Sequence, residues 1–132
     1  LNIITGTEKM QVALINRSNK TKEEYAQMLE EIEIKARNVE LRGENFTEED
    51  YKKIATLIES ETGEKVEYID YRDPKDVYVK IPTVNIRLGS LNPSIFDKIQ
   101  RLPSLIPQVK MINKKVKYLD LRWDMSYMKM DE

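Results

Sequence analysis

The sequence VKYLDLRWDMSYMKM, residues 116–130, is the most regular stretch of the chain. Apolar side chains occupy the odd positions from Leu119 to Tyr127, and polar side chains stand between them. Alternation with a period of two places the apolar side chains on one face of a β-strand. The stretch therefore predicts one long, half-buried strand from Val116 to Met130. Because a strand that outruns its neighbours leaves backbone groups unpaired, we expect it to lie at an open edge of its sheet.

Further strands are predicted upstream of this stretch. The runs with apolar or β-branched composition are 11–15, 39–42, 66–72, 77–81 and 84–88. Residues 73–76 have turn chemistry, since Pro fixes φ and Asp bonds its own downstream amides. Pro82 lacks a ladder donor and therefore marks the turn of a hairpin.

Two capped helices are predicted in the first half. Thr21 and Glu24 have capping-box spacing, and an apolar stripe of 3.6-residue period continues from there to about Arg37. Thr47 repeats the capping pattern at the start of a second helix, and Gly63 stands where a left-handed residue ends it.

A third helix is predicted in the second half. Asn92 is its expected N-cap and Pro93 its first residue, while Pro103 disturbs the apolar stripe and Pro107 ends it. The elements together predict an α+β fold, with a mainly antiparallel sheet and helices packed on one face.

Composition narrows the possible chemistry. The 132 residues suit one domain, with 22 Lys and Arg against 23 Asp and Glu. The chain has no Cys and no His, which excludes disulfides, Cys/His zinc sites and histidine-based catalytic triads. Its balanced charge does not indicate a nucleic-acid partner, and no membrane span or signal peptide is visible. A binding module, without cofactor or small-molecule substrate, is favoured over an enzyme.

The charged clusters have ordinary structural interpretations. Asp70, Asp73 and Asp76 do not have the spacing of a calcium loop and are expected in turns. Asp120 and Asp124, four residues apart on a strand, are too distant to share a metal easily. The lysines of residues 110–117 are expected in a solvated loop rather than at a phosphate or lipid contact.

The C-terminal tail is the candidate interaction site. Trp123, Met125 and Tyr127 fall on the apolar face of the predicted strand, where Trp123 is expected to anchor the strand end. Met128 and Met130 fall on the polar face, where soft apolar side chains favour contact with a partner.

The second half of the chain resembles a known family in the order of its motifs. Four segments follow one another in this half, namely VEYIDYRDPKDVYVKI, IRLG, KIQRLPSL and VKYLDLRWD. Near the start of the chain, residues 3–6 read IITG. This arrangement is similar to the C-terminal extracytoplasmic β domain of the bacterial cell-division protein FtsQ, called DivIB in Gram-positive bacteria. Residues 64–125 carry most of the likeness. Ile81-Pro82-Thr83 departs from the family, which often has a Gly-containing turn there, and Leu1-Asn2 stands where the family often has Pro.

The resemblance implies a non-catalytic scaffold for septal peptidoglycan synthesis. Residues 1–132 would form a single β domain, cut from a longer protein with a transmembrane helix and a POTRA domain upstream. The chain begins with Leu1 rather than Met, as expected of such a fragment. The family lies on the extracytoplasmic side of the bacterial cell membrane, at the division septum.

The implied partners are FtsB/DivIC-like and FtsL-like division proteins. The family binds them by strand addition at its closing strand. That contact corresponds here to Arg122, Trp123, Asp124, Met125, Ser126, Tyr127 and Met128.

Three alternatives remain open. A POTRA-like or chaperone-type module of another envelope assembly would share the open edge. A metal hydrolase based on Asp and Glu would bring several carboxylates into one pocket. Alternatively, residues 116–130 pair on both sides within their own sheet, or lack order at the tail, and offer no docking edge.

Overall fold

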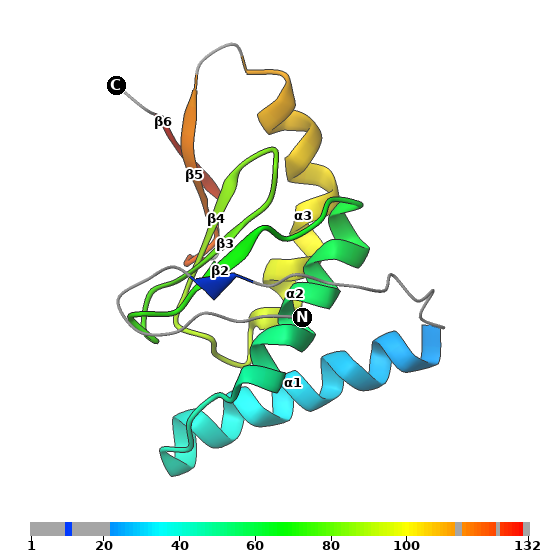
Figure 1. Cartoon of the computed structure of the whole chain (residues 1–132), viewed down its shortest axis with the longest axis vertical. Helices are drawn as coiled ribbons and strands as arrows, with labels where there is room; N and C mark the ends of the chain where they lie inside the picture. Colours follow the sequence, from blue (N-terminus) through cyan, green and yellow to red (C-terminus); the bar gives the residue numbers. More distant parts are fainter. Residues whose placement is uncertain (1–9, 12–21, 113–114, 124, 131–132) are drawn as a thin grey trace.

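A computed structural model describes residues 10–11, 22–112, 115–123 and 125–130, which form a six-stranded sheet and three helices (Figure 1). The strands are β1 Met10–Gln11, β2 Tyr68–Asp70, β3 Val77–Lys80, β4 Asn85–Gly89, β5 Val116–Asp120 and β6 Tyr127–Met130. The helices are α1 Lys22–Arg42, α2 Glu48–Thr62 and α3 Ile95–Lys110. The predicted α+β class is confirmed. Of the predicted strand 11–15, residues 12–15 lie outside the described part of the chain, as does the IITG segment.

The strands lie side by side in chain order, from β1 to β6. All neighbours are antiparallel except β4 and β5, which run parallel. α3 connects these two strands, as a parallel pair requires a crossover. Ile86 of β4 stands opposite Leu119 of β5, and the Leu121 amide donates to the Arg87 carbonyl at 2.9 Å beyond the last paired residue.

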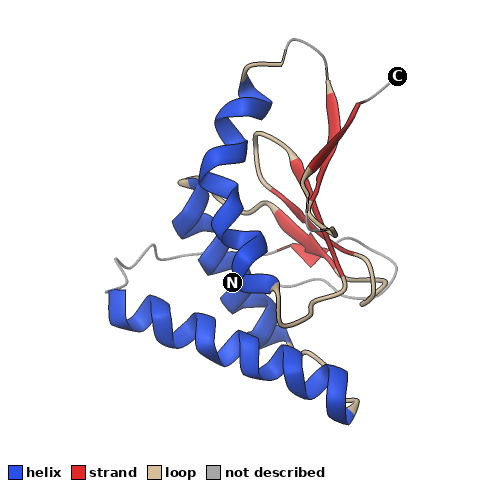
Figure 2. Cartoon of the chain, turned by 180° about the vertical axis from the view of Figure 1, so that it is seen from behind, coloured by secondary structure: helices blue, strands red, loops and turns tan. Residues whose placement is uncertain are grey.

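The core lies between the helices and one face of the sheet. α2 and α3 lie on one side of the sheet in both views, and α1 packs against these two helices (Figures 1 and 2). Val77 and Val79 of β3 are fully buried, while Tyr78 between them is only half-buried. Ile54 of α2 and Ile99 of α3 belong to the same buried cluster as these valines. Alternation along β3 therefore separates a core face from a partly exposed outer face.

The capping pattern at α2 is confirmed. The Thr47 amide donates to the Asp50 carboxylate at 2.8 Å, and the Asp50 amide donates to the Thr47 hydroxyl at 3.3 Å. Gly63 ends the helix with φ of 70°. These short-range bonds explain why the sequence located this helix within a residue or two.

The predicted strand over residues 39–42 is wrong, because α1 continues through them to Arg42. Glu40, Leu41 and Arg42 are good helix formers, and no breaker precedes Gly43. Gly43 has φ of 68°, and its amide donates to the Val39 carbonyl at 3.1 Å. The glycine therefore ends the helix in the manner of a left-handed cap.

α3 also differs from its predicted bounds. It begins at Ile95, because the Asn92 side chain accepts from the Ser94 amide at 2.9 Å and forms a turn before the helix. It then passes through Pro103 and continues beyond Pro107, where the sequence predicted its end, to Lys110. Each proline costs a helical hydrogen bond. The buried stripe of Ile95, Ile99, Leu102, Ile106 and Val109 offsets this cost by packing on the core.

The predicted long strand from Val116 to Met130 is two strands. β5 ends at Asp120, and β6 turns back to pair antiparallel with it, so that Asp120 stands opposite Tyr127. The Asp120 carboxylate accepts a hydrogen bond from the Arg122 amide at 3.0 Å, which bends the backbone directly after the strand. An aspartate that bonds its own downstream amide thus ends the strand, although the polar–apolar alternation continues.

Candidate functional site: the C-terminal hairpin

β6 is an edge strand of the sheet. β5 is its neighbour on one side, and no described strand pairs with it on the other. β5 itself pairs on both sides, with β4 and β6. The open edge that the sequence predicted is therefore present in the described part of the chain, but it belongs to four residues of β6.

The faces of β6 are the reverse of those predicted. Met128 and Met130 are half-buried, and Met128 packs against the core cluster. Tyr127, which was expected to face the core, is 52% exposed. The turn between the strands changes which positions face inward, so the parity of residues 119–121 does not carry over to 127–130.

Three large apolar side chains are exposed on the hairpin turn and β6. Trp123 is 56% exposed and Met125 is 67% exposed, so both expectations of core packing are wrong. The Tyr127 hydroxyl lies 3.9 Å from the Met125 sulfur, which places these two side chains together. We call Trp123, Met125 and Tyr127 the apolar edge patch. Aromatic and methionine side chains of this kind are enriched at protein interfaces.

Arg122 and Asp120 form a close ion pair next to Trp123. The Arg122 Nε lies 3.0 Å from one carboxylate oxygen of Asp120, and its terminal nitrogen lies 2.8 Å from the other. Burial alone would raise the pKa of the Asp120 carboxyl, but the hydrogen bonds and charge of Arg122, with a contribution from Arg87, lower it below its usual range. The Arg122 guanidinium also lies over the Trp123 ring, 5.0 Å from its centroid. Arg122 is therefore held in the hairpin from both sides.

α3 holds the hairpin turn through Arg101. Its guanidinium donates to the Ser126 hydroxyl at 2.9 Å and to the Trp123 carbonyl at 3.2 Å. A cleft of about 410 Å³ lies between α3 and the turn, with Arg101, Arg122 and Trp123 among its lining residues. Ser126, a predicted contact residue, is thus partly occupied by an internal hydrogen bond.

The sequence predicted neither Arg101 nor Lys98 as part of this region. Lys98 is almost fully buried in α3, and its ammonium donates to the Leu88 carbonyl at 3.1 Å. Burial lowers the pKa of Lys98, with a further contribution from Arg101. No local pattern marks either residue, although a lysine within an apolar helical stripe is a signal that could have drawn attention to position 98.

The structure places all but one of the predicted site residues on one hairpin. Arg122, Trp123, Met125, Ser126, Tyr127 and Met128 all lie on the hairpin turn and β6. Asp124 lies outside the described residues. The arrangement offers main-chain hydrogen-bonding groups along an edge and apolar side chains next to them, which is the chemistry of strand addition.

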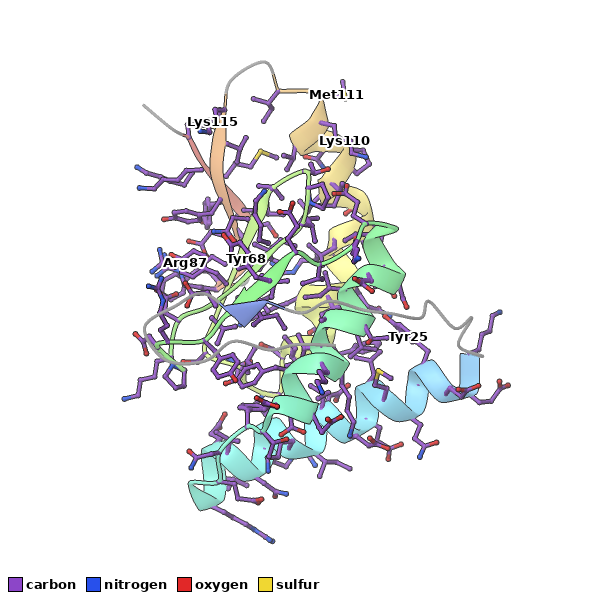
Figure 3. The ribbon with its side chains drawn as sticks, viewed as in Figure 1. Tyr25, Tyr68, Arg87, Lys110, Met111 and Lys115 are labelled. Atoms are coloured by element: carbon purple, nitrogen blue, oxygen red, sulfur yellow. The ribbon has the colours of Figure 1, made fainter. Side chains whose placement is uncertain are left out.

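The aspartates of residues 70–76 serve local structure. The Asp73 carboxylate accepts from the Lys75 amide at 3.0 Å, as expected in a turn. Asp76 pairs with Arg87 on the outer face of the sheet, through two contacts of 2.8 Å (Arg87 is labelled in Figure 3). Among the residues that the structure describes, no three carboxylates gather closely enough to hold a metal ion.

The described helices include none that is both long and apolar enough to cross a membrane. Comparison of the chain with protein-family models, with curated proteins and with solved structures finds no match.

Proposed function

We propose that this chain is a non-catalytic docking domain that binds a partner by strand addition at β6. The partners proposed are FtsB/DivIC-like and FtsL-like division proteins, and the proposed role is to support septal peptidoglycan synthesis. The proposal places the domain on the extracytoplasmic side of a bacterial cell membrane, with its anchor outside these residues.

The observation that carries the proposal is an open strand edge flanked by exposed apolar side chains. β6 has one described neighbour, and Trp123, Met125 and Tyr127 are each more than half exposed. Soluble proteins usually protect such edges with charge, proline or a covering element. Here Lys129 is the one charged side chain on β6, and the remaining three residues of the strand are Tyr and Met. Because β6 is short and carries this one charge, the exposed apolar side chains beside the edge, more than the edge itself, favour a partner.

The cell-division assignment rests on the motif order described above. The segments YID, VYVK, IRLG and YLDLRW, which carry the resemblance, lie on β2, β3, β4 and β5 with its turn. They are adjacent in the sheet and lead to β6. All three residues of the exposed apolar edge patch are among the seven contacts that the resemblance implies.

Binding can be measured by titration calorimetry with the extracytoplasmic segments of the FtsB/DivIC-like and FtsL-like proteins from the same genome. Deleting β6 would uncover β5 and create a new edge, so substitutions are the better probe. Met125→Asp combined with Tyr127→Asp changes only exposed side chains and should abolish binding while thermal melting stays cooperative. Met111→Asp is the matched control, because Met111 is 82% exposed and lies after α3, far from the turn in Figure 3.

Hydrogen exchange separates strand addition from other modes of contact. We expect those amides of residues 127–130 that point away from β5 to exchange more slowly in the complex, because a partner strand would accept their hydrogen bonds. Absence of binding by the folded wild-type chain would overturn the division assignment. Binding without protection of these amides would overturn strand addition.

A further inference from the structure

The outer face of the sheet holds a cation between two tyrosines. Arg87 lies between Tyr78 and Tyr118, with its guanidinium carbon 5.3 Å and 5.2 Å from the two ring centroids. The same guanidinium donates to the Tyr118 hydroxyl at 3.1 Å. Figure 3 shows Arg87 on the side of the sheet away from α2 and α3. A cation over an aromatic ring is a favourable contact, and here one arginine makes it on both of its sides.

β6 begins the same arrangement and leaves it half complete. Lys129 stands directly opposite Tyr118 of β5, on the outer face of the sheet. Tyr127 and Lys129 are both exposed, whereas Met128 between them is half-buried and packs against the core. Lys129 therefore has a tyrosine on its β5 side, and no described strand supplies one on its other side.

A second copy of β6 would supply the missing tyrosine. Two identical strands that pair antiparallel about a two-fold axis keep core-facing residues opposite core-facing ones and exposed residues opposite exposed ones. With Met128 opposite Met128 of the second copy, Tyr127 of each copy stands opposite Lys129 of the other. Lys129 would then lie between Tyr118 of its own chain and Tyr127 of the second copy. This arrangement repeats that of Arg87 between its two tyrosines.

Charge selects this register over the neighbouring ones. A slip of two residues, the smallest that keeps the faces matched, places Lys129 opposite Lys129 of the second copy. Like charges directly opposite each other destabilise a strand pair. A slip in the other direction brings turn residues opposite β6, and Ser126 in that turn is already bonded to Arg101. One symmetric register therefore combines strand pairing with favourable side-chain pairs.

We propose that β6 pairs with β6 of a second copy of this chain, so that the two sheets join across a two-fold axis. Each copy contributes a strand of only four residues, so the dimer is weak, with a dissociation constant on the order of 0.1–1 mM. Self-pairing occupies the edge of the proposed docking function and competes with it, a consequence that rests on that function. The dimer itself requires no division partner.

Sedimentation equilibrium of the whole chain, from about 10 μM to about 1 mM, covers the expected range of self-association. Tyr127→Lys places lysines opposite each other at both symmetric positions and should weaken self-association by about tenfold or more. Adding Lys129→Glu to this variant restores opposite charges at both positions and should restore the dimer. Tyr127→Phe is the matched control, because it keeps the aromatic ring and should associate as wild type does.

Cysteine cross-linking tests the register directly, because the chain has no cysteine of its own. Met128 lies on the proposed axis, where opposite Cα atoms are about 4.5–5.5 Å apart, a span that a disulfide can bridge. Oxidised Met128→Cys should therefore form a covalent dimer. Met111→Cys should not, although Met111 is 82% exposed and the more accessible of the two. Thermal melting of the reduced variants checks that both are folded.

Three results would overturn the proposal. The first is a wild-type chain that stays monomeric up to about 1 mM. The second is a folded double variant that stays monomeric, because opposite charges would then not set the register. The third is equal cross-linking at both cysteine positions, which would show random collision. Calorimetry with the division partners at about 20 μM chain, below the dissociation constant of the dimer, tests the docking function separately.

Discussion

Replacing Gly89 by alanine should disturb the hairpin turn in a way that the equivalent change at Gly43 does not. Gly89 has φ of 71° and Gly43 has φ of 68°, so both substitutions force a Cβ into the left-handed region. That strain costs about 1 kcal/mol at each position. The two sites differ in what the new Cβ would meet. At Gly43 nothing lies within 4 Å, whereas at Gly89 the Cγ of Arg122 would be 2.7 Å away.

The additional cost at Gly89 follows from the contacts of Arg122. A Cβ contact below 3.0 Å is not tolerated, so the stem of Arg122 must move. Its guanidinium bonds Asp120 and lies over Trp123, and both arrangements depend on the position of that stem. Losing a charge-assisted bond of about 1.5–3 kcal/mol and a surface cation–π contact of about 0.5–1 kcal/mol adds about 2–4 kcal/mol to the strain, so Gly89→Ala should lose about 3–5 kcal/mol in total. For Gly43→Ala the free energy of unfolding should fall only by the backbone strain, about 1 kcal/mol.

Urea unfolding of the two variants measures this difference. Trp123 is the single tryptophan of the chain, so its fluorescence reports directly on the hairpin. We expect a changed emission for folded Gly89→Ala and an unchanged one for Gly43→Ala. Equal losses of unfolding free energy, with the same emission in both, would refute the close approach of β4 and Arg122.

Three further predictions concern charge and packing. Because the pKa of Asp120 is lowered in the folded state, its ionised carboxylate stabilises the fold above the ordinary carboxyl range, and this stabilisation is lost as pH falls through the folded-state pKa. In urea titrations the free energy of unfolding of wild type should therefore exceed that of Asp120→Asn by less as pH is lowered. A difference that stays constant with pH would contradict this. The pKa of Lys98 is also lowered, and for an amine this has the opposite consequence. The free energy of unfolding of wild type, relative to that of Lys98→Met, should rise with pH as the ordinary lysine pKa is approached. A relative stability that does not change with pH would count against burial of a charged amine. Ile54→Ala, at a fully buried position, should lower the free energy of unfolding by about 2–5 kcal/mol. Leu41→Ala, at a position that is 74% exposed, should lower it by less than about 0.5 kcal/mol. Calorimetric melting measures both, and a larger loss for Leu41→Ala than for Ile54→Ala would contradict the burial pattern.

Local chemistry explains which elements the sequence predicted well. The cap at Thr47 and the glycine at position 63 act over a few residues, so α2 could be located from letters alone. The hairpin of β3 and β4 follows from alternation around Pro82, and the short bond from the Ile81 amide to the Val84 carbonyl closes it at 3.1 Å. Interactions within one turn of chain are the ones that sequence patterns record.

The splitting of the C-terminal strand had a signal that period alone could not reveal. Asp70 and Arg72 at the end of β2 form the same arrangement as Asp120 and Arg122 at the end of β5. In each pair the arginine amide and guanidinium both bond the aspartate two residues earlier. Asp-x-Arg therefore ends two strands of this sheet. The same signal at Asp120 predicts that the strand ends there, even though the polar–apolar alternation continues to Tyr127.

Long-range contacts could not be predicted in this way. Arg101 reaches Ser126 from a helix twenty-five residues earlier, and Lys80 lines one cleft with Lys110 and Lys117 through the sheet order. Both depend on the crossover from β4 through α3 to β5, which is a property of the whole fold. The residues of the hairpin could be listed from sequence, but not which of them are already engaged internally.

The shortness of β6 determines where binding energy at this edge must come from. Four residues offer only a few outward main-chain groups, each contributing about 1 kcal/mol net. A nanomolar complex requires about 12 kcal/mol, so strand pairing alone cannot supply it. The exposed side chains of Trp123, Met125 and Tyr127 are the nearest apolar surface, and buried aromatic anchors contribute about 2–4 kcal/mol each. A partner of high affinity must therefore cover the turn as well as pair with the strand, and a peptide matched to β6 alone should bind only weakly.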